Sequence, residues 1–471
     1  MTTKLLPKHR PNFGRPFLVI LLLVIGGIAC TLTADSSDTS DKAPIATKPV
    51  EPTPTLYANI QASGGGANPP SGIPNNVTSD VPQSANLANQ IIQVDGNRVV
   101  NSIVNLVRYE NRHTLSEPSQ VRGIHAARDY LLSEFYGIQA ANPDIRIDVS
   151  RHQYEFRYRG QPVLADNVMM VINGTDQAAG IVLVGAHYDT ISNASFTESR
   201  NYQPGANDNG SGVAAVMELA RILAQKPHRA TIVLVLFSGE ELGRYGSQAY
   251  LNEYILRNNI PLKAVINLDI IGSPTGSNGE RYDNQMRVYS AAPNNSPSRQ
   301  LARLIEFVGR NFVPDISVNL EDSVDRSGRW SDHQTFSDAG FPAIRLIEQS
   351  DESNRAHTAR DTLEDIENDY IRRTTQVALA TLVVLTDGPD APADVRLDPA
   401  TWRLEWLPSR GATHYVVVFR QPGSLIYDLQ MVVDVTGLNW IDMPRYEAVA
   451  IAAINGEGQM GPFSNEVAIP R

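Results

Sequence analysis

Uninterrupted apolar runs constrain the fold of this 471-residue chain more than any other feature. The runs at residues 181–186 and 231–237 lack the alternation of polar and apolar residues that a strand with one solvated face shows. They therefore predict strands that are covered on both sides, and helical segments lie between them. This order is typical of an α/β protein with a mostly parallel central sheet flanked by helices on both faces. Such sheets bind ligands at the carboxyl ends of their strands.

The individual elements follow from the same patterns. The predicted strands are 167–172, 181–186, 231–237, 264–268, 286–290 and 343–347. The predicted helices are 213–224, 247–258, 298–312 and 369–385, with an earlier amphipathic helix at Ile124, Ala127, Leu131 and Phe135.

Changes in composition divide the chain into four predicted segments. Residues 1–30 form a leader, and residues 31–90 are rich in Ser, Thr, Pro, Ala and Asn. Because residues 31–90 cannot bury a core, we expect a disordered linker there. Residues 91–387 carry the α/β pattern and form the main predicted domain. Residues 388–471 alternate short β-like segments with turns and are predicted to form a small all-β sandwich.

Aromatic residues would form the core of this C-terminal sandwich. Trp406, Tyr415 and Tyr446 lie in or beside its predicted strands. Together with Asn455-Gly-Glu-Gly458 and Ser464-Asn-Glu-Val467, they make the segment resemble a fibronectin type III domain. Such a module could contact a surface, a carbohydrate or a protein. The alternative is a β-rich extension packed on the preceding domain, with no separate role.

The first 30 residues have the features of an export signal. Four Lys and Arg residues between positions 4 and 15 precede the apolar run 17–25, and small residues follow up to Cys30. Cys30 is the only cysteine and stands where a bacterial lipoprotein signal places the acylated residue. We therefore expect an exported protein, lipid-anchored in the cell envelope outside the cytoplasm. The alternatives are an uncleaved membrane anchor, because the apolar run can be extended to Ala34, and plain secretion.

The charge of the chain limits its partners. The formal net charge is −11, and no Lys- and Arg-rich stripe follows Arg15. A nucleic-acid-binding surface is normally basic, so we expect no nucleic-acid partner.

Five short stretches are dense in side chains that can bind a metal ion. They are 185–190 with His187 and Asp189, 205–212 with Asp208, 237–243 with Glu240 and Glu241, 267–272 with Asp269, and 356–362 with His357. Residues two apart in a strand share a face, so His187 could bind a metal while Asp189 reaches the far nitrogen of its ring. Adjacent carboxylates such as Glu240 and Glu241 are costly inside a cleft unless a cation or a proton offsets them.

Each stretch taken alone also has an ordinary interpretation. Asp208 could cap the helix that follows it, Asp269 could be a solvated turn carboxylate, and His357 a solvated histidine. His333, in Ser331-Asp332-His333, is the main rival to His357.

Taken together and in this order, the five stretches closely resemble the bacterial leucyl aminopeptidase and aminopeptidase Y family of co-catalytic zinc exopeptidases. The resemblance covers about residues 91–386, with the motifs between Val184 and Thr362. It implies an aminopeptidase that binds two Zn²⁺ per chain. Such an enzyme removes N-terminal residues from peptides, using a water molecule that both ions activate. Asn207 is a small departure, because an Asp is frequent at this position.

The resemblance also implies a role for each residue. His187, Asp208 and Asp269 would hold one zinc ion, while Asp208, Glu241 and His357 would hold the other. Glu240 would be the general base and later the general acid, and Asp189 would orient His187. Asp332 and His333 match a further part of the pattern and are expected to line the site or to support it from behind.

Other functions are compatible with parts of the pattern. A glutaminyl cyclase has a similar fold and uses a single zinc ion, but the intact Asp-Asn-Gly-Ser-Gly sequence and His357 favour the two-metal peptidase. A carboxypeptidase or a dipeptidase could use the same scaffold. A catalytically inactive surface-binding protein is a further alternative, against which the complete ligand set argues. The sequence contains no His-Glu-x-x-His motif, which excludes the thermolysin-type plan.

Overall fold

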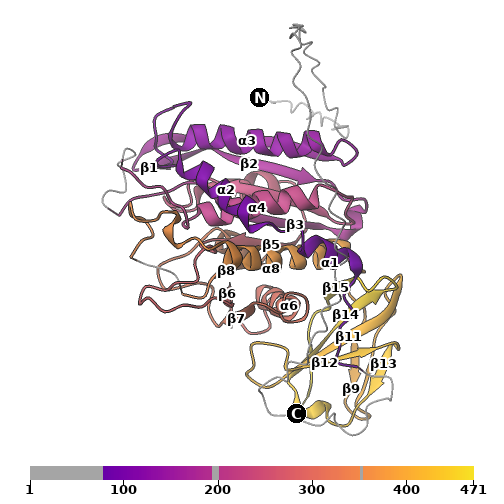
Figure 1. Cartoon of the computed structure of the whole chain (residues 1–471). Coiled ribbons are helices and arrows are strands. Elements are labelled where there is room, and N and C mark those ends of the chain that lie inside the picture. Colours follow the sequence, from indigo (N-terminus) through magenta and orange to yellow (C-terminus); the bar gives the residue numbers. More distant parts are fainter. Residues whose placement is uncertain (1–77, 194–200, 351–353, 471) are drawn as a thin grey trace, which may run out of the picture. The chain divides into compact units, whose positions relative to one another are not determined.

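A central sheet organises the computed structural model, which describes residues 78–193, 201–350 and 354–470 (Figure 1). Eight strands of the described residues pair in the order β1-β2-β4-β3-β5-β8-β6-β7. They are β1 (Ile147–Tyr158), β2 (Gln161–Ile172), β3 (Ile181–His187), β4 (Thr231–Phe237), β5 (Leu262–Leu268), β6 (Gln285–Ser290), β7 (Ser317–Glu321) and β8 (Ala343–Glu348). The β3–β4, β3–β5, β5–β8 and β6–β7 pairs are parallel, and the remaining pairs are antiparallel. The predicted α/β fold with a mostly parallel sheet is confirmed.

Helices cover both faces of this sheet. They are α1 (Ala85–Ile91), α2 (Gly96–Val107), α3 (Gly123–Ala141), α4 (Gly210–Leu223), α5 (Tyr245–Tyr250), the π-helical segment η2 (Leu251–Leu256), α6 (Pro297–Phe312), α7 (His333–Asp338) and α8 (Asn368–Asp387). Short 3₁₀ turns η1 (Gln177–Ala179) and η3 (Leu363–Asp365) lie in the same domain, and η4 (Met443–Arg445) lies in the C-terminal region. Val182 and Val184 of β3 share a core cluster with α4 and α8, whereas Leu183 shares one with η2. Neighbouring residues of one strand are thus buried on opposite faces, which is why the apolar runs are uninterrupted.

Ordered structure begins before the predicted end of the linker at residue 90. Helix α1 starts at Ala85, its first turn is capped by the Ser84 hydroxyl, and Leu87 and Ile91 are buried in the main core. A helix of seven residues is too short to show a clear hydrophobic period, so the sequence pattern did not reveal it. The leader with Cys30 and the linker up to residue 77 lie outside the described residues. Within the described part, no helix is both long and apolar enough to cross a bilayer.

The C-terminal region consists of two antiparallel sheets. One contains β9 (Arg396–Asp398), β10 (Arg403–Glu405) and β13 (Gly437–Asn439), and the other contains β11 (Ala412–Arg420), β12 (Leu429–Val433), β14 (Ala448–Asn455), β15 (Met460–Phe463) and β16 (Val467–Ala468). Leu404, Val417 and Val449 meet in the core between the sheets, and the Trp406 and Tyr415 rings contact edge-to-face at 5.4 Å. The predicted C-terminal all-β region is therefore present.

The larger of these sheets is buried on both faces. Val416 and Val418 of β11 belong to the same core cluster as residues of α6 and α8. The fully buried Arg303 of α6 donates to the Leu425 carbonyl at 2.9 Å and pairs with Glu466 at 3.1 Å. The region therefore packs directly on the α/β domain, which is the arrangement expected of an extension that supports it. Its resemblance to a fibronectin type III domain remains a prediction.

Candidate metal centre

The carboxyl ends of three neighbouring parallel strands bring the predicted ligands together. His187 is the last residue of β3, Glu240 and Glu241 follow β4, and Asp269 follows β5. Asp208 lies just before α4, and His357 lies in the segment after β8. Ligand atoms of His187, Asp208 and Asp269 all lie within 4.8 Å of one another, as do those of Asp208, Glu241 and His357. The fold thus gathers every predicted ligand into two groups that share Asp208.

The two oxygens of Asp208 are divided between these groups. Its Oδ1 lies 3.4 Å from His187 Nε2, and its Oδ2 lies 3.2 Å from His357 Nε2. Asp269 Oδ1 is also 3.4 Å from His187 Nε2, while Glu241 Oε2 is 3.0 Å from His357 Nε2. Glu240 is further away, with its Oε2 at 4.0 Å from His187 Nε2. A third group of His187, Glu240 and Glu241 also falls within 4.8 Å, so proximity alone does not separate the two glutamates.

Glycine and a side-chain cap shape the turn that carries Asp208. Asn209 caps α4 by accepting a hydrogen bond from the Gly212 N–H, so the Asp208 carboxylate is free to face the two histidines. A Cβ at Gly212 would collide with the Leu268 carbonyl oxygen and with the Asn209 side chain. Gly212 and the Asn209 cap therefore allow close packing of this turn against the end of β5.

The Asp189 carboxylate holds the turn that carries the two glutamates. Its Oδ1 and Oδ2 accept the backbone N–H groups of Glu240 and Glu241, both at 3.2 Å, and Oδ2 also accepts the Thr114 hydroxyl at 2.9 Å. Towards His187 Nδ1, its backbone oxygen lies at 3.2 Å and its carboxylate at 3.7 Å. Asp189 therefore connects the ends of β3 and β4 as well as contacting His187.

Arg345 connects a ligand position to residues behind the cluster. Its guanidinium is buried on β8 and pairs with Asp269 at 3.1 Å and with Asp325 at 2.9 Å. Asp325 Oδ2 is in turn 3.8 Å from His333 Nε2, which donates to the Val324 carbonyl at 2.7 Å. Burial lowers the pKa of His333 to about 4, so its imidazole is neutral at neutral pH.

The other residue of this predicted pair, Asp332, is also buried next to the cluster. Burial raises the pKa of its carboxyl to about 7, with the charges of Asp189 and Asp269 adding to the effect. Asp332 and His333 are not among the described residues that line the cavity at the cluster. Both lie behind the ligands.

Sequence reasoning missed Arg112, which holds two of the ligand-bearing loops. Arg112 is fully buried and donates to the carbonyl oxygens of Tyr188 (2.7 Å), Pro204 (2.5 Å) and Gly205 (2.9 Å). Its backbone N–H donates to the Thr190 hydroxyl at 2.8 Å. One guanidinium thus ties the segment after His187 to the turn before Asp208. An isolated Arg in a polar loop carries no local signal of such a role.

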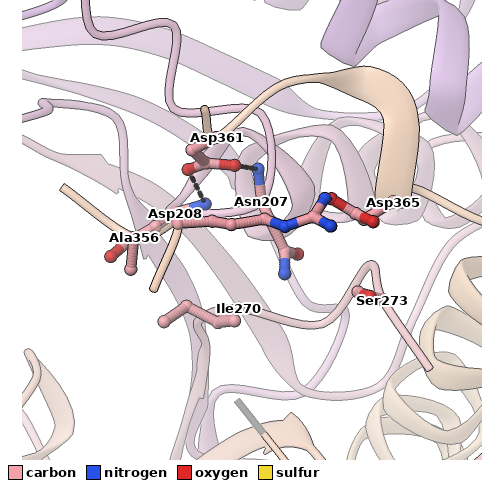
Figure 2. A pocket seen from close by; sticks show the side chains of 8 residues that line it. Asn207, Asp208, Ile270, Ser273, Ala356, Asp361 and Asp365 are labelled. Atoms are coloured by element: carbon pink, nitrogen blue, oxygen red, sulfur yellow. Dashed lines mark hydrogen bonds and ion pairs between the residues drawn. The ribbon is translucent and has the colours of Figure 1, made fainter. Parts of the chain in front are cut away.

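Sequence reasoning also missed the role of Asp361, which lies four residues after His357. Asp361 is 3% exposed, and its carboxylate accepts the backbone N–H groups of Asn207 at 2.7 Å and Asp208 at 2.9 Å (Figure 2). Burial raises its pKa to about 7, although these two N–H groups favour the ionised form. One loop therefore supplies both His357 and the group that positions the backbone of Asp208.

Asn207, the departure from the expected pattern, does not face the cluster. Its side-chain amide donates to Glu348 at 2.9 Å, and its side-chain oxygen accepts the Gly272 N–H at 2.9 Å. An amide can donate to a buried carboxylate, which an ionised Asp cannot do. An Asn at position 207 is therefore suited to donate a hydrogen bond to Glu348.

The pKa shifts of the cluster residues indicate an excess of negative charge at this site. Burial raises the pKa of Glu240 well above its usual value, and the neighbouring Glu241 raises it further. Mainly because of Glu241, the pKa of His357 rises to about 11. Burial alone would lower the pKa of His187, but the charges of Asp269 and Glu240 raise it well above its usual value. Without cations, the carboxylates would therefore keep both imidazoles protonated.

Comparisons with known proteins identify relatives of this chain. The family model described as Peptidase family M28 matches residues 167–382. A probable zinc metalloprotease of Pyricularia oryzae is 33% identical over 411 residues, which cover 78% of this chain and 81% of that protein. A probable zinc metalloprotease of Leptosphaeria maculans is 31% identical over 406 residues, which cover 78% of this chain and 92% of that protein.

Two solved structures from Legionella pneumophila have a similar fold. The LapA aminopeptidase matches with a TM-score of 0.51 and 22% identity, over 65% of this chain and 76% of that chain. LapB matches with a TM-score of 0.52 and 21% identity, over 65% of this chain and 76% of that chain. At this level of identity the likeness shows the fold alone.

The α/β fold and the carboxylate–histidine cluster fit an enzyme that binds metal ions, and the sequence relatives identify its class and family. The chain belongs to peptidase family M28 and is a peptidase, a hydrolase that acts on peptide bonds. Its relatives in the comparison are named as zinc metalloproteases.

Proposed function

We propose that the chain is an exported, zinc-dependent aminopeptidase that binds two zinc ions and removes N-terminal residues from peptides. The observation that carries this proposal is the division of Asp208 between the two groups, with Oδ1 facing His187 and Oδ2 facing His357. A carboxylate that shares its oxygens in this way can bridge two cations. With Asp208 shared, each ion would have three protein ligands and open positions for water and substrate, as a catalytic zinc site requires.

The donor set fits zinc. Among the described residues, Asp269 Oδ1 and Glu241 Oε1 are buried oxygens without a hydrogen-bond donor. A buried carboxylate oxygen that lacks a donor is unfavourable, and a cation would satisfy it. Two imidazoles and three carboxylates are ligands that zinc accepts. Zinc at these positions would also offset the negative charges that raise the pKa values of both histidines.

The proposed chemistry divides the work between zinc and this chain. When bound, zinc polarises the peptide carbonyl and brings the pKa of water from about 15.7 to about 7. Glu240 accepts the proton of the attacking water and passes it to the leaving amine, a role that its place beside the His187 group allows, with Oε2 at 4.0 Å from His187 Nε2. Asp189 holds the backbone of Glu240 in place, and Arg345 holds Asp269.

Metal content and substrate specificity test the proposal. Elemental analysis of the undialysed protein should give two zinc ions per chain, and chelation should abolish hydrolysis of aminoacyl-p-nitroanilides. One tightly held ion with full activity would contradict the two-metal site. Conversion of glutaminyl peptides to cyclised products, without release of N-terminal residues, would favour the glutaminyl cyclase alternative. Cobalt or manganese in place of zinc would leave the mechanism intact, because carboxylate-rich sites accept several cations.

A matched pair of variants separates the roles of the adjacent glutamates. Glu240→Gln should retain both zinc ions while turnover falls by roughly a hundredfold or more, the usual scale for loss of a general base. Glu241→Gln removes a charged ligand from the His357 group, so zinc should leak from that position and added metal should partly restore activity. Zinc content and turnover are measured for both. Zinc loss from Glu240→Gln with full occupancy in Glu241→Gln would reverse the assignment.

Export is proposed on the sequence alone. The basic leader, the apolar run 17–25 and the single Cys30 are the features that support a lipid-anchored protein of the cell envelope. These residues lie outside the described part of the chain.

A further inference from the structure

An arginine-rich cavity adjoins the proposed metal site. It has a volume of about 360 Å³, and the six residues of the cluster form part of its wall. The other part carries the side chains of Arg244, Arg326, Arg329 and Trp330, with Arg345 beside Asp269. A substrate bound at the cluster would therefore extend past several guanidinium groups.

Arg244 follows the two glutamates directly and is placed by the same turn. Its backbone N–H donates to the Glu240 carbonyl at 2.8 Å, and its guanidinium carbon lies 6.0 Å from the centre of the Trp330 ring. Among the described residues, its Nη1 is buried without a hydrogen-bond acceptor. An unsatisfied buried guanidinium nitrogen in a cavity wall is a binding group for an anion.

The backbone of Arg244 supports a functional interpretation of its side chain. Arg244 has φ of 62°, in the left-handed region that Gly adopts easily and that other residues adopt at an energetic cost. Gly243 precedes it, so the chain has small residues in this turn, yet the strained position carries a long charged side chain.

The remaining arginines are held by the loop before α7. The N–H of Arg329 donates to the Arg326 carbonyl at 3.2 Å, and Gly328 with φ of 72° closes the turn between them. Arg326 also contacts Asp325 through its Nε at 3.3 Å. This turn places both side chains on the wall that faces Arg244, and Trp330 is 51% exposed beside them.

Arg244, Arg326 and Arg329 form what we call the arginine wall, and its positive charge is local. The chain as a whole has a net charge of −11, so a group of arginines in one cavity is not a result of general basicity. Two zinc dications would balance the four carboxylates that line the cavity, namely Asp208, Glu240, Glu241 and Asp269. Arg244 would then present a positive charge to the substrate, whereas Arg326 is paired with Asp325. Arginine presents a planar fork that binds carboxylates with two parallel hydrogen bonds.

We propose that this arginine wall binds a carboxylate of the substrate, so that the enzyme prefers peptides with a carboxylate within about one side-chain length of the scissile bond. The proposal rests on the proposed function and adds the substrate class to it. The carboxylate can come from two sources, which are an acidic N-terminal side chain or the C-terminal carboxylate of a dipeptide.

Matched substrates distinguish these sources. Glutamyl-p-nitroanilide and glutaminyl-p-nitroanilide differ only in the charge of the side chain, and leucyl-glycine and leucyl-glycinamide differ only in the terminal carboxylate. The zinc-loaded protein should prefer the acid in one of the pairs by about tenfold or more in kcat/KM, since a hydrogen-bonded ion pair contributes on that scale. The pair that shows the preference identifies the source.

A variant of Arg244, with a matched control at Arg257, tests the wall itself. Arg244→Gln should reduce the acid-to-amide ratio by about tenfold, while Arg257→Gln, at an exposed position outside the cavity, should leave the ratio unchanged. Calorimetric binding of free glutamate and glutamine to the zinc-loaded protein gives a second measurement that does not depend on turnover. Thermal unfolding confirms that both variants are folded.

The outcomes separate this inference from the proposed function. Hydrolysis of the neutral substrates that equals or exceeds that of the acids, with an Arg244→Gln ratio like that of the wild type, would overturn the inference and leave the aminopeptidase intact. Tighter binding of glutamate than glutamine without any hydrolysis would support the carboxylate site and overturn the aminopeptidase. Equal binding of glutamate and glutamine without any hydrolysis would overturn both.

Discussion

Replacing Asp361 by Asn changes two hydrogen bonds without altering the shape of the site. The Asp361 carboxylate accepts the N–H groups of Asn207 and Asp208, at 2.7 and 2.9 Å. Asn has nearly the same size, but its amide offers one oxygen to these two donors. Its NH₂ group would then face the second N–H, and two donors repel each other.

The expected loss follows from these two bonds. A hydrogen bond to a charged acceptor contributes about 1.5–3 kcal/mol, and a buried donor without an acceptor costs about 1–3 kcal/mol. Asn retains one neutral bond worth about 1 kcal/mol. Burial of the ionised carboxylate, which raises its pKa to about 7, opposes part of this contribution. We therefore expect Asp361→Asn to lower the free energy of unfolding of the metal-free protein by roughly 1–3 kcal/mol above about pH 8, where Asp361 is ionised, and by less in acid.

The same change should weaken zinc binding although Asp361 is not a proposed ligand. Its two bonds fix the backbone of Asp208, the residue shared by both groups. Loss of a group that orients a ligand typically lowers metal affinity by about 10–100-fold. Urea unfolding followed by circular dichroism measures the stability, and competition with a chromophoric chelator measures the affinity.

An exposed carboxylate provides the control. Asp369, in the first turn of α8, has a side chain that is 77% exposed, so Asp369→Asn should change the unfolding free energy by less than about 0.5 kcal/mol. If Asp361→Asn matches this control in both stability and zinc affinity, the backbone of Asp208 is held by other contacts and the reasoning is wrong.

Four further predictions concern other parts of the chain. Because one ammonium cannot reach all three carbonyls that Arg112 binds, Arg112→Lys should lower the unfolding free energy by about 1–3 kcal/mol in urea titrations. Asn207→Asp places a second carboxylate against Glu348 and should destabilise the protein by about 1–3 kcal/mol at neutral pH and less in acid; equal stability at both would contradict this. With a pKa of about 11, His357 is protonated in the metal-free protein at neutral pH, so zinc binding must release its proton and the affinity should rise with pH, by up to about tenfold per unit for each proton released. Calorimetry in buffers of different ionisation enthalpy counts these protons, and a pH-independent affinity would exclude the coupling. Cys30→Ser should release the protein from membranes or block its processing; retention in the membrane at the normal processed size would exclude the lipoprotein.

Sequence patterns predicted the sheet where burial is uniform and failed where it is not. The runs at β3 and β4 were readable because both of their faces are buried. Strand β1 alternates exposed residues with the buried His152, Tyr154 and Phe156, and no strand was predicted there. The helix predicted over 247–258 is instead α5 followed by the π-helical η2, because residue spacing does not distinguish an α-helical from a π-helical turn.

By itself, the sequence determined the chemical groups of the site and their order along the chain. His187, Asp208, Glu240, Glu241, Asp269 and His357 stand next to strands or helices, where local rules place side chains at the edge of a sheet. Only the tertiary structure decided which atoms meet: that Asp208 divides its oxygens between two histidines, and that Arg244 and Arg329 face one cavity. The residues that hold the ligands, Arg112 and Asp361, act through backbone groups distant in sequence. Every residue carries the same backbone N–H and C=O groups, so a sequence does not mark which of them a buried side chain will bind.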